Sequence, residues 1–285
     1  MFVIAGVTGH VGSVVAETLI AKGEKIKVIV RDAAKGAVWS KKGAEVAVGT
    51  LEDSAFVTAA LKGATGFFTL LPPNYQATDF FKTQRETADA IASAVKASGV
   101  PHVVMLSSLG ADLEAGTGPI RGLHYLENVF GTTGTKLTAI RASSFQENAA
   151  QVLAPAKSAG IFPNFGDSAD HPFPMVATKD IAALAAAELV SGAGKSETVD
   201  LVGPSYSNAQ LANLLGKALG KKLQIVNIPQ PGWVPALVQA GFSQHIAEVF
   251  AEMYAGAASG KFEPRGDRRV QAKTPLEATI ATLTA

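Results

Sequence analysis

Three glycines, at positions 6, 9 and 12, lie in the stretch GVTGHVG directly behind the apolar run MFVIA. A tight turn needs one glycine, a second lets the backbone approach a pyrophosphate, and a third lets a helix pack closely on a strand. The free N–H groups at a helix start also attract anions. Because a first strand passes into a first helix here, the pattern favours a dinucleotide-phosphate site over an ordinary glycine turn. The residues expected at this site are Gly6, Thr8, Gly9, His10, Val11 and Gly12.

The end of the second apolar run indicates which dinucleotide is bound. An NAD site places Asp or Glu there to accept from the ribose 2′-hydroxyl, whereas this chain has Arg31 in VRDAAK. A guanidinium binds a 2′-phosphate through charge-assisted hydrogen bonds, and Lys35 can add charge. The alternatives are a solvated surface arginine at position 31 and an Asp32 that serves a ribose. The sequence favours NADPH over NADH.

The elements that must position these residues alternate regularly over the first 143 residues. Apolar runs that predict strands are separated by segments with helical periodicity, such as 79–98. Strict alternation of this kind predicts a parallel sheet with right-handed crossovers and helices on both faces. The fold class is therefore a doubly wound α/β sheet, a Rossmann fold, with strands expected at 2–7, 26–31, 45–49, 66–71, 102–108 and 137–143.

The second half of the chain has a looser pattern. We expect a nucleotide-binding domain over 1–150 and a smaller, substrate-facing α/β lobe over 151–285. In that lobe the Pro-, Gly- and Phe-rich segment 160–175 is expected to be a loop region, and 197–204 is expected to return as a strand to the main sheet. Helices are expected over 179–191, 209–219 and within 236–257.

Composition excludes several classes of function. The chain has no cysteine and a net charge of +1, so thiol chemistry is excluded and nucleic acid is a poor partner. The five histidines are scattered without metal-ligand spacing, so no metal is expected. No apolar segment is long enough for a bilayer, and we expect a cytoplasmic protein, monomeric or homodimeric, that acts on a small molecule.

Three stretches together carry a resemblance: GVTGHVG, VRDAAK and RASSFQEN (141–148). With them the sequence resembles the NmrA-like branch of the atypical short-chain dehydrogenases, and especially its azoreductase and quinone reductase members. The resemblance extends through ATKDIAA (177–183) and GPSYSNAQLANLLGKALGK (203–221). It implies an NAD(P)-binding enzyme that reduces a small aromatic acceptor.

The resemblance also implies roles for particular residues. Leu71 and Pro72 would flank the middle of the cofactor, and Ser107 and Ser108 would lie beside the nicotinamide. Phe145 and Asn148 would border the substrate. His124 lies where a related quinone reductase also has histidine, so the catalytic candidates are His124, Tyr125 and Asn148.

The chain departs from typical short-chain dehydrogenases at their Tyr-x-x-x-Lys motif. The fourth residue after Tyr125 is Val129, so the lysine that lowers the tyrosine pKa is absent. Tyr125 is then better interpreted as a packing or surface residue than as a general acid. Alcohol oxidation is disfavoured, whereas direct hydride transfer to a quinone or azo group, without flavin, mainly requires proximity. Aromatic walls could come from Phe145, Phe162, Phe165 and Trp233, although core packing is the commoner role of each.

Two rival hypotheses remain. The first is a redox-sensing regulator that binds NADP(H) and a protein partner without turnover, which the missing motif allows. The second is a reductase of the phenylpropanoid type, which is disfavoured because that group uses a lysine in the helix after the fifth strand. This chain has no lysine between Lys96 and Lys136.

Overall fold

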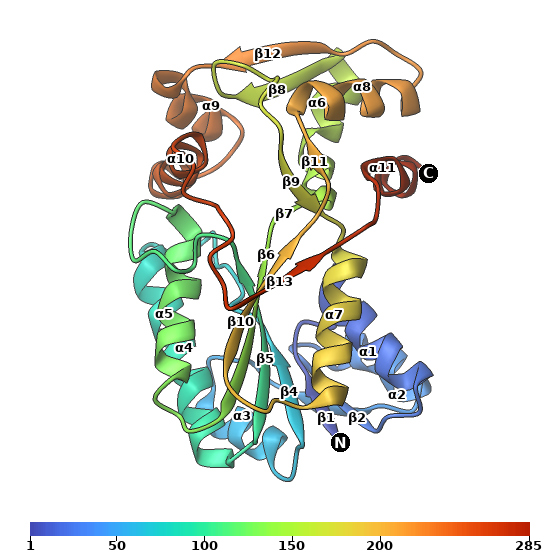
Figure 1. The fold of residues 1–285 in the computed structure, drawn as a ribbon, viewed down its shortest axis with the longest axis vertical. Coiled ribbons are helices and arrows are strands. Elements are labelled where there is room, and N and C mark those ends of the chain that lie inside the picture. The colour runs from blue at the N-terminus through green and yellow to red at the C-terminus, as the bar shows by residue number, and fades with distance from the viewer.

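The computed structural model describes residues 1–285 and is built around one eight-stranded sheet (Figure 1). The strand order is β13-β10-β6-β5-β4-β1-β2-β3, and every neighbouring pair is parallel. The order reverses between β1 and β4, which is where a doubly wound sheet opens its ligand crevice. The strands are β1 (Phe2–Ile4), β2 (Ile26–Val30), β3 (Glu45–Val48), β4 (Gly66–Thr69), β5 (His102–Ser108), β6 (Lys136–Ala142), β10 (Glu197–Val202) and β13 (Arg268–Gln271).

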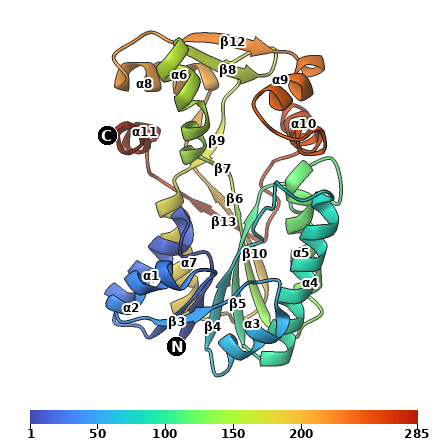
Figure 2. The ribbon, with the colours of Figure 1, turned by 180° about the vertical axis from the view of Figure 1, so that it is seen from behind.

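Helices cover both faces of this sheet, which confirms the predicted fold class (Figure 2). One face carries α1 (His10–Ala21), α2 (Ala33–Lys41) and α7 (Thr178–Ser191). The other carries α3 (Ser54–Leu61), α4 (Phe80–Ser98) and α5 (Arg121–Phe130). Each face has its own core of more than twenty buried side chains, and strand residues contribute to both. The inner strands are therefore buried on both sides, as their apolar composition predicts, whereas the edge strands β3 and β13 are partly exposed.

The smaller lobe is built from short elements. Its helices are α6 (Leu153–Ala159), α8 (Asn208–Ala218), α9 (Trp233–Gln239), α10 (Gln244–Ala258) and α11 (Leu276–Thr284), with short 3₁₀ segments η2 (Gln146–Val152) and η3 (Gln230–Gly232). A further 3₁₀ segment, η1 (Gly118–Ile120), leads directly into α5 of the main sheet's helical layer. Ser207 caps α8 through the Gln210 N–H, in a capping box. The remaining strands are β7 (Ser144–Phe145), β8 (Ile161–Phe165), β9 (Phe173–Val176), β11 (Ser205–Tyr206) and β12 (Gln224–Ile228).

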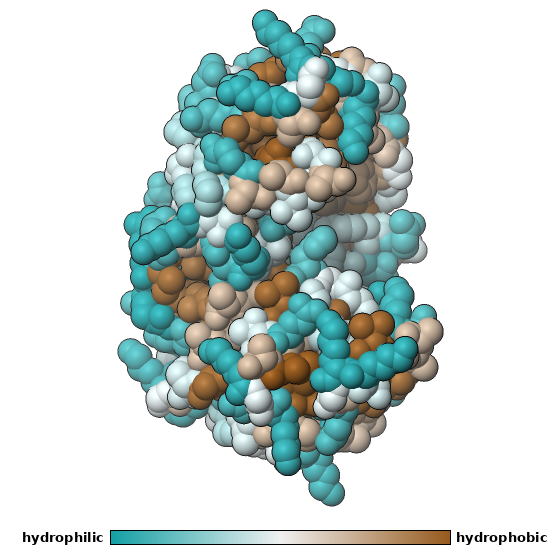
Figure 3. Space-filling view, turned by 90° about the vertical axis from the view of Figure 1, so that its right-hand side faces the viewer, coloured by the Kyte–Doolittle hydropathy of each residue, from teal (hydrophilic) through white to brown (hydrophobic).

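The expectation of a loop region over 160–175 was wrong, because this segment contains β8 and β9. β8 pairs in parallel with β12, whereas β9 lies between β7 and β11. Each of these pairings joins residues far apart in sequence, so local composition gave no sign of them. The two lobes meet at a hollowed waist, visible from the side of α7 and α11 (Figure 3).

The second half of the chain contributes two strands to the main sheet. The segment expected to return, 197–204, forms β10 beside β6, and β13 pairs with β10 at the sheet edge. Asp200 of β10 accepts from the Gly266 N–H, which holds the turn that leads into β13. No helix in the structure is both long enough and apolar enough to cross a membrane.

A buried ion pair fastens α5 to the sheet. The Arg141 guanidinium on β6 donates to both carboxylate oxygens of Glu127 on α5, with Nε 3.1 Å from Oε1, and Ser107 on β5 also donates to Glu127. Only 10% of the Arg141 side chain and 8% of the Glu127 side chain are exposed. Removing one partner would leave the other charge buried without compensation.

We therefore predict that Glu127→Ala lowers the free energy of unfolding by about 3–5 kcal/mol, because Arg141 and Ser107 lose their acceptor. Urea denaturation followed by circular dichroism measures this loss. The matched control is Glu86→Ala on α4, where the Lys82–Glu86 pair is largely exposed and should contribute less than about 1 kcal/mol. Equal losses in the two variants would contradict a structural role for the buried pair.

Candidate functional site

The glycine stretch connects β1 to α1 in the way its spacing predicts. Gly6 has a φ of +70°, a conformation that residues with a Cβ rarely adopt. A Cβ on Gly12 would lie 2.4 Å from the Gly6 carbonyl oxygen, so α1 packs too closely on the strand end for any side chain there. Gly9 differs, because the nearest atom to a Cβ there would be 3.5 Å away. Packing within the protein does not require a glycine at position 9, whereas close approach of a ligand would.

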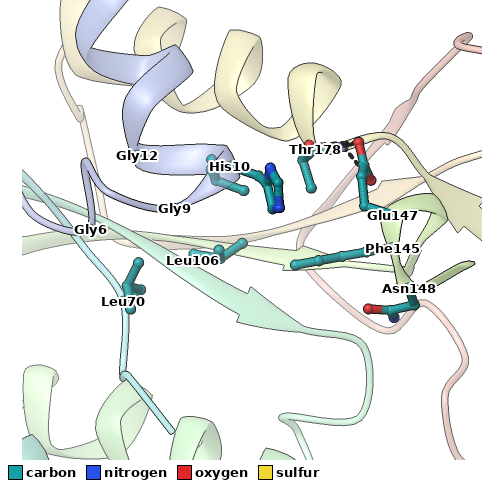
Figure 4. Close-up of a pocket in the computed structure, with 11 residues that line it drawn as sticks. Gly6, Gly9, His10, Gly12, Leu70, Leu106, Phe145, Glu147, Asn148 and Thr178 are labelled. Atoms are coloured by element: carbon teal, nitrogen blue, oxygen red, sulfur yellow. Dashed lines mark hydrogen bonds between the residues drawn. The ribbon is translucent and has the colours of Figure 1, made fainter. Parts of the chain in front are cut away.

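A cavity of about 330 Å³ opens from this loop toward β7 and η2 (Figure 4). Seven residues expected at the cofactor or substrate lie on its wall, and four that the sequence did not single out join them. The expected residues are Gly6, Gly9, His10, Val11, Gly12, Phe145 and Asn148, and the additional ones are Leu70, Leu106, Glu147 and Thr178. The glycine loop forms one end of this cavity, and Phe145, Glu147 and Asn148 form the other. The His10 ring extends between them, from the start of α1 toward Thr178.

Several other expected cofactor residues do not line this cavity. Leu71 is buried in the core between the sheet and α4, and Leu70 lines the cavity in its place, because successive side chains of extended backbone point to opposite sides. At the end of β5 the same alternation brings Leu106 to the cavity. Ser107 bonds to Glu127, and Ser108 donates to the Leu109 carbonyl. Thr8 is exposed and Pro72 half-buried, and neither is on the cavity wall.

Arg31 lies just beyond the end of β2, exposed and without an ion pair, and Lys35 is exposed one helical turn later. Asp32, the alternative ribose ligand, is the N-cap of α2 and accepts from the Ala34 N–H at 2.8 Å. Its carboxylate therefore has a local structural partner, whereas the two cationic side chains have none.

His124 and Tyr125 do not line the glycine-loop cavity. They lie in a second hollow of about 280 Å³, formed by α4, α5 and the loop before α5. The His124 ring is held by the Ala111 carbonyl at 2.8 Å and by Asn128 at 2.9 Å. The Tyr125 hydroxyl donates to Asp89 at 2.8 Å, and this hydrogen bond raises the pKa of Tyr125 above its usual value. Both catalytic candidates on α5 are thus engaged with neighbouring helix and loop residues.

Phe165 and Trp233 meet in the smaller lobe, around Tyr254 of α10. The Phe165 ring stacks on the Tyr254 ring with their centroids 4.9 Å apart. The Trp233 ring packs edge-on against the same Tyr254 ring, with a centroid distance of 5.7 Å. Burial raises the pKa of Tyr254 to about 12, so its hydroxyl stays protonated at neutral pH. Phe162 is a core residue, packed among the buried side chains of this lobe. Neither Phe165 nor Trp233 is on the wall of the glycine-loop cavity.

Glu147 is the one charged residue among the four that sequence reasoning missed, although it lies inside the quoted stretch RASSFQEN. Its carboxylate accepts from the Thr178 N–H at 2.9 and 3.1 Å and from the Thr178 hydroxyl at 2.6 Å. Thr178 begins α7, so Glu147 satisfies one free N–H group at the start of that helix from a distant part of the chain. No local signal in the sequence connects the two residues.

Comparisons with known proteins give matches over nearly the whole chain. The NmrA-like family model matches residues 1–282. The NAD(P)H azoreductase of Xenophilus azovorans is 26% identical over 90% of this chain and 86% of its own length. Quinone oxidoreductase 2 of Escherichia coli (strain K12) is 30% identical over 91% of this chain and 89% of its own.

A likeness of fold extends to solved structures. The triphenylmethane reductase of Citrobacter sp., solved in complex with NADP(H), superposes with a TM-score of 0.84 at 21% identity and covers 99% of this chain and 100% of its own. The match to the family model spans both lobes and confirms the resemblance carried by the glycine, arginine and RASSFQEN stretches. The chain belongs to the NmrA-like family.

Proposed function

We propose that this protein is an NADPH-dependent reductase that delivers hydride directly, without flavin, to an electrophilic aromatic acceptor such as a quinone or an azo compound. The observation that carries the proposal is the single cavity that runs from the glycine loop to Phe145 and Asn148. The curated relatives, named as an azoreductase and a quinone oxidoreductase, support an NAD(P)H-dependent reductase.

The residues at the glycine loop fit a dinucleotide. Gly9 leaves space at the start of α1 for a pyrophosphate, and the first N–H groups of α1 supply the donors that such a group needs. A bound NADPH would supply the hydride. The choice of NADPH over NADH rests on Arg31 and Lys35, which are free to bind a 2′-phosphate.

The far end of the cavity fits a reaction that needs little acid–base help. Leu70, Leu106 and Phe145 give apolar walls that exclude water, and Asn148 is an uncharged polar group at the rim. Such a site holds two flat rings face to face, which is catalysis by proximity and orientation. Hydride transfer leaves a delocalised anion on the acceptor, and solvent can protonate that anion. No tyrosine or lysine on the cavity wall is required.

The experiment that tests the proposal is NADPH oxidation by the purified protein, followed at the absorbance of the reduced cofactor with a panel of quinones and azo dyes. Consumption that requires an acceptor and is faster with NADPH than with NADH is the expected result. Tight NADPH binding without NADPH consumption in the presence of any acceptor would contradict the proposed reductase activity. It would favour the redox-sensing regulator instead.

We predict that Arg31→Glu raises the Kd for NADPH by about ten- to a hundredfold, because a charge-assisted contact becomes a repulsion. The Kd for NADH should change far less, since NADH has no 2′-phosphate. Titration of each cofactor by fluorescence measures both constants, and Lys35→Glu should show the same pattern with a smaller change. An equal rise in the Kd for NADPH and in the Kd for NADH would assign Arg31 a role other than recognition of the 2′-phosphate.

Gly9 and Gly12 provide a matched pair of variants. Gly9→Ala should change the free energy of unfolding by no more than about 1 kcal/mol, since the protein leaves room for the methyl group. It should nevertheless raise the NADPH Kd about tenfold or more, by blocking close approach of the phosphates. Gly12→Ala should cost about 2 kcal/mol or more of stability, because its methyl group meets the backbone at Gly6. Unchanged NADPH affinity in Gly9→Ala would argue against a phosphate at this loop.

A further inference from the structure

Glu147 is the only carboxylate on the wall of the glycine-loop cavity, and no arginine or lysine neutralises it. The cavity wall contains two ionisable side chains: His10, whose ring extends from the start of α1 toward Thr178, and Glu147, which is bound to Thr178. Glu147 forms no ion pair within 4 Å, and its hydrogen-bond partners are the backbone and hydroxyl of Thr178. These two donors, which make three contacts with the carboxylate, partly compensate the charge, as does the positive end of α7. A net negative charge remains at this end of the cavity.

The topology indicates which part of a dinucleotide this charge would meet. Arg31 follows β2, on the β2–β3 side of the switch point, so the adenosine half belongs there. The pyrophosphate belongs at the glycine loop. The other half then extends toward the carboxyl ends of β4, β5 and β6, where Leu70, Leu106 and Phe145 lie. Glu147 is on that side, and this step rests on the proposed function.

We infer that Glu147 sets the redox preference of the site, so that oxidised cofactor is bound more favourably than reduced cofactor. A nicotinamide ring is neutral when reduced and carries one positive charge after its hydride has left. A nearby carboxylate stabilises the positive form and does little for the neutral one, and its effect is strengthened where apolar walls exclude water. The pyrophosphate carries the same charge in both forms, so the glycine loop does not discriminate between them.

This preference has a consequence for the reaction. Two electrons leave the ring with the hydride and reduce the acceptor, and the ring becomes cationic beside Glu147. The carboxylate therefore contributes more in the product state than in the ground state, which favours transfer toward the acceptor. It also holds the oxidised cofactor after turnover, so NADP⁺ is expected to dissociate more slowly than NADPH.

The test compares the two dissociation constants, Kd(NADPH) and Kd(NADP⁺), by isothermal titration calorimetry without any acceptor. In the unmodified protein the ratio Kd(NADPH)/Kd(NADP⁺) should exceed one. Glu147→Gln, which keeps the size but removes the charge, should lower this ratio about fivefold or more. Asn148→Asp places a second negative charge at the same end of the cavity and should raise the ratio, which provides a test if Glu147→Gln folds poorly.

Two control variants separate charge from structure. Thr178→Val removes the hydroxyl donor to Glu147 but keeps the carboxylate, so the melting temperature should fall while the ratio stays within about twofold. Glu248→Gln removes a negative charge from the exposed surface of α10 and should also leave the ratio unchanged. A ratio that moves equally in Thr178→Val and Glu147→Gln would overturn the inference and assign Glu147 a purely structural role.

The outcomes also distinguish this inference from the proposed function. If both nucleotides bind and acceptors are reduced, but Glu147→Gln leaves the ratio unchanged, the inference fails and the reductase stands. If the unmodified protein binds neither nucleotide, the proposed function fails and the inference fails with it. A large ratio without turnover supports the inference and favours the redox-sensing regulator.

Discussion

The close approach of Gly12 to the Gly6 carbonyl is the constraint on which the site depends. It fixes the N-terminus of α1 against the end of β1, where the strand order of the sheet reverses. α1 in turn packs against α7 through small and branched side chains of the shared core. Since α7 begins at Thr178 and Thr178 is bound by Glu147, one line of contacts connects the glycine loop to the opposite end of the cavity. A change in the first contact would therefore displace groups at both ends.

The polar side chains of Ser107 and Arg141, near the ends of β5 and β6, bind a residue on the α5 side of the sheet and therefore do not line the cavity. Arg141 and Ser107 are both occupied by Glu127, on the α5 side of the sheet. Leu106 has the opposite orientation and faces the cavity. The same separation occurs at the end of β4, with Leu71 in the core and Leu70 on the cavity wall. The resulting site is mostly apolar with a single carboxylate, and this suits hydride transfer better than acid–base chemistry.

The smaller lobe is fastened to the sheet at two places and built around aromatic rings. β10 and β13 extend the main sheet, so the second half of the chain contributes to the sheet as well as to the lobe. A row of rings from Phe165 through Tyr254 and Phe250 to Tyr75 then connects the lobe to the loop after β4. That loop begins at Leu70, on the cavity wall, so packing in the smaller lobe positions one side of the site.

The sequence by itself determined the elements whose signals are local. The alternation of apolar runs and helical periodicity predicted the doubly wound sheet, and the glycine spacing predicted the turn into α1, because both depend on residues close together in the chain. Tertiary structure decided which side chain at each strand end faces the cavity, since a shift of one residue reverses the face. It also decided the pairings of β8 and β9, the engagement of His124 and Tyr125 with neighbouring residues, and the bond between Glu147 and Thr178. Each of these depends on contacts between residues that local patterns do not relate, and they become neighbours only when the whole chain has folded.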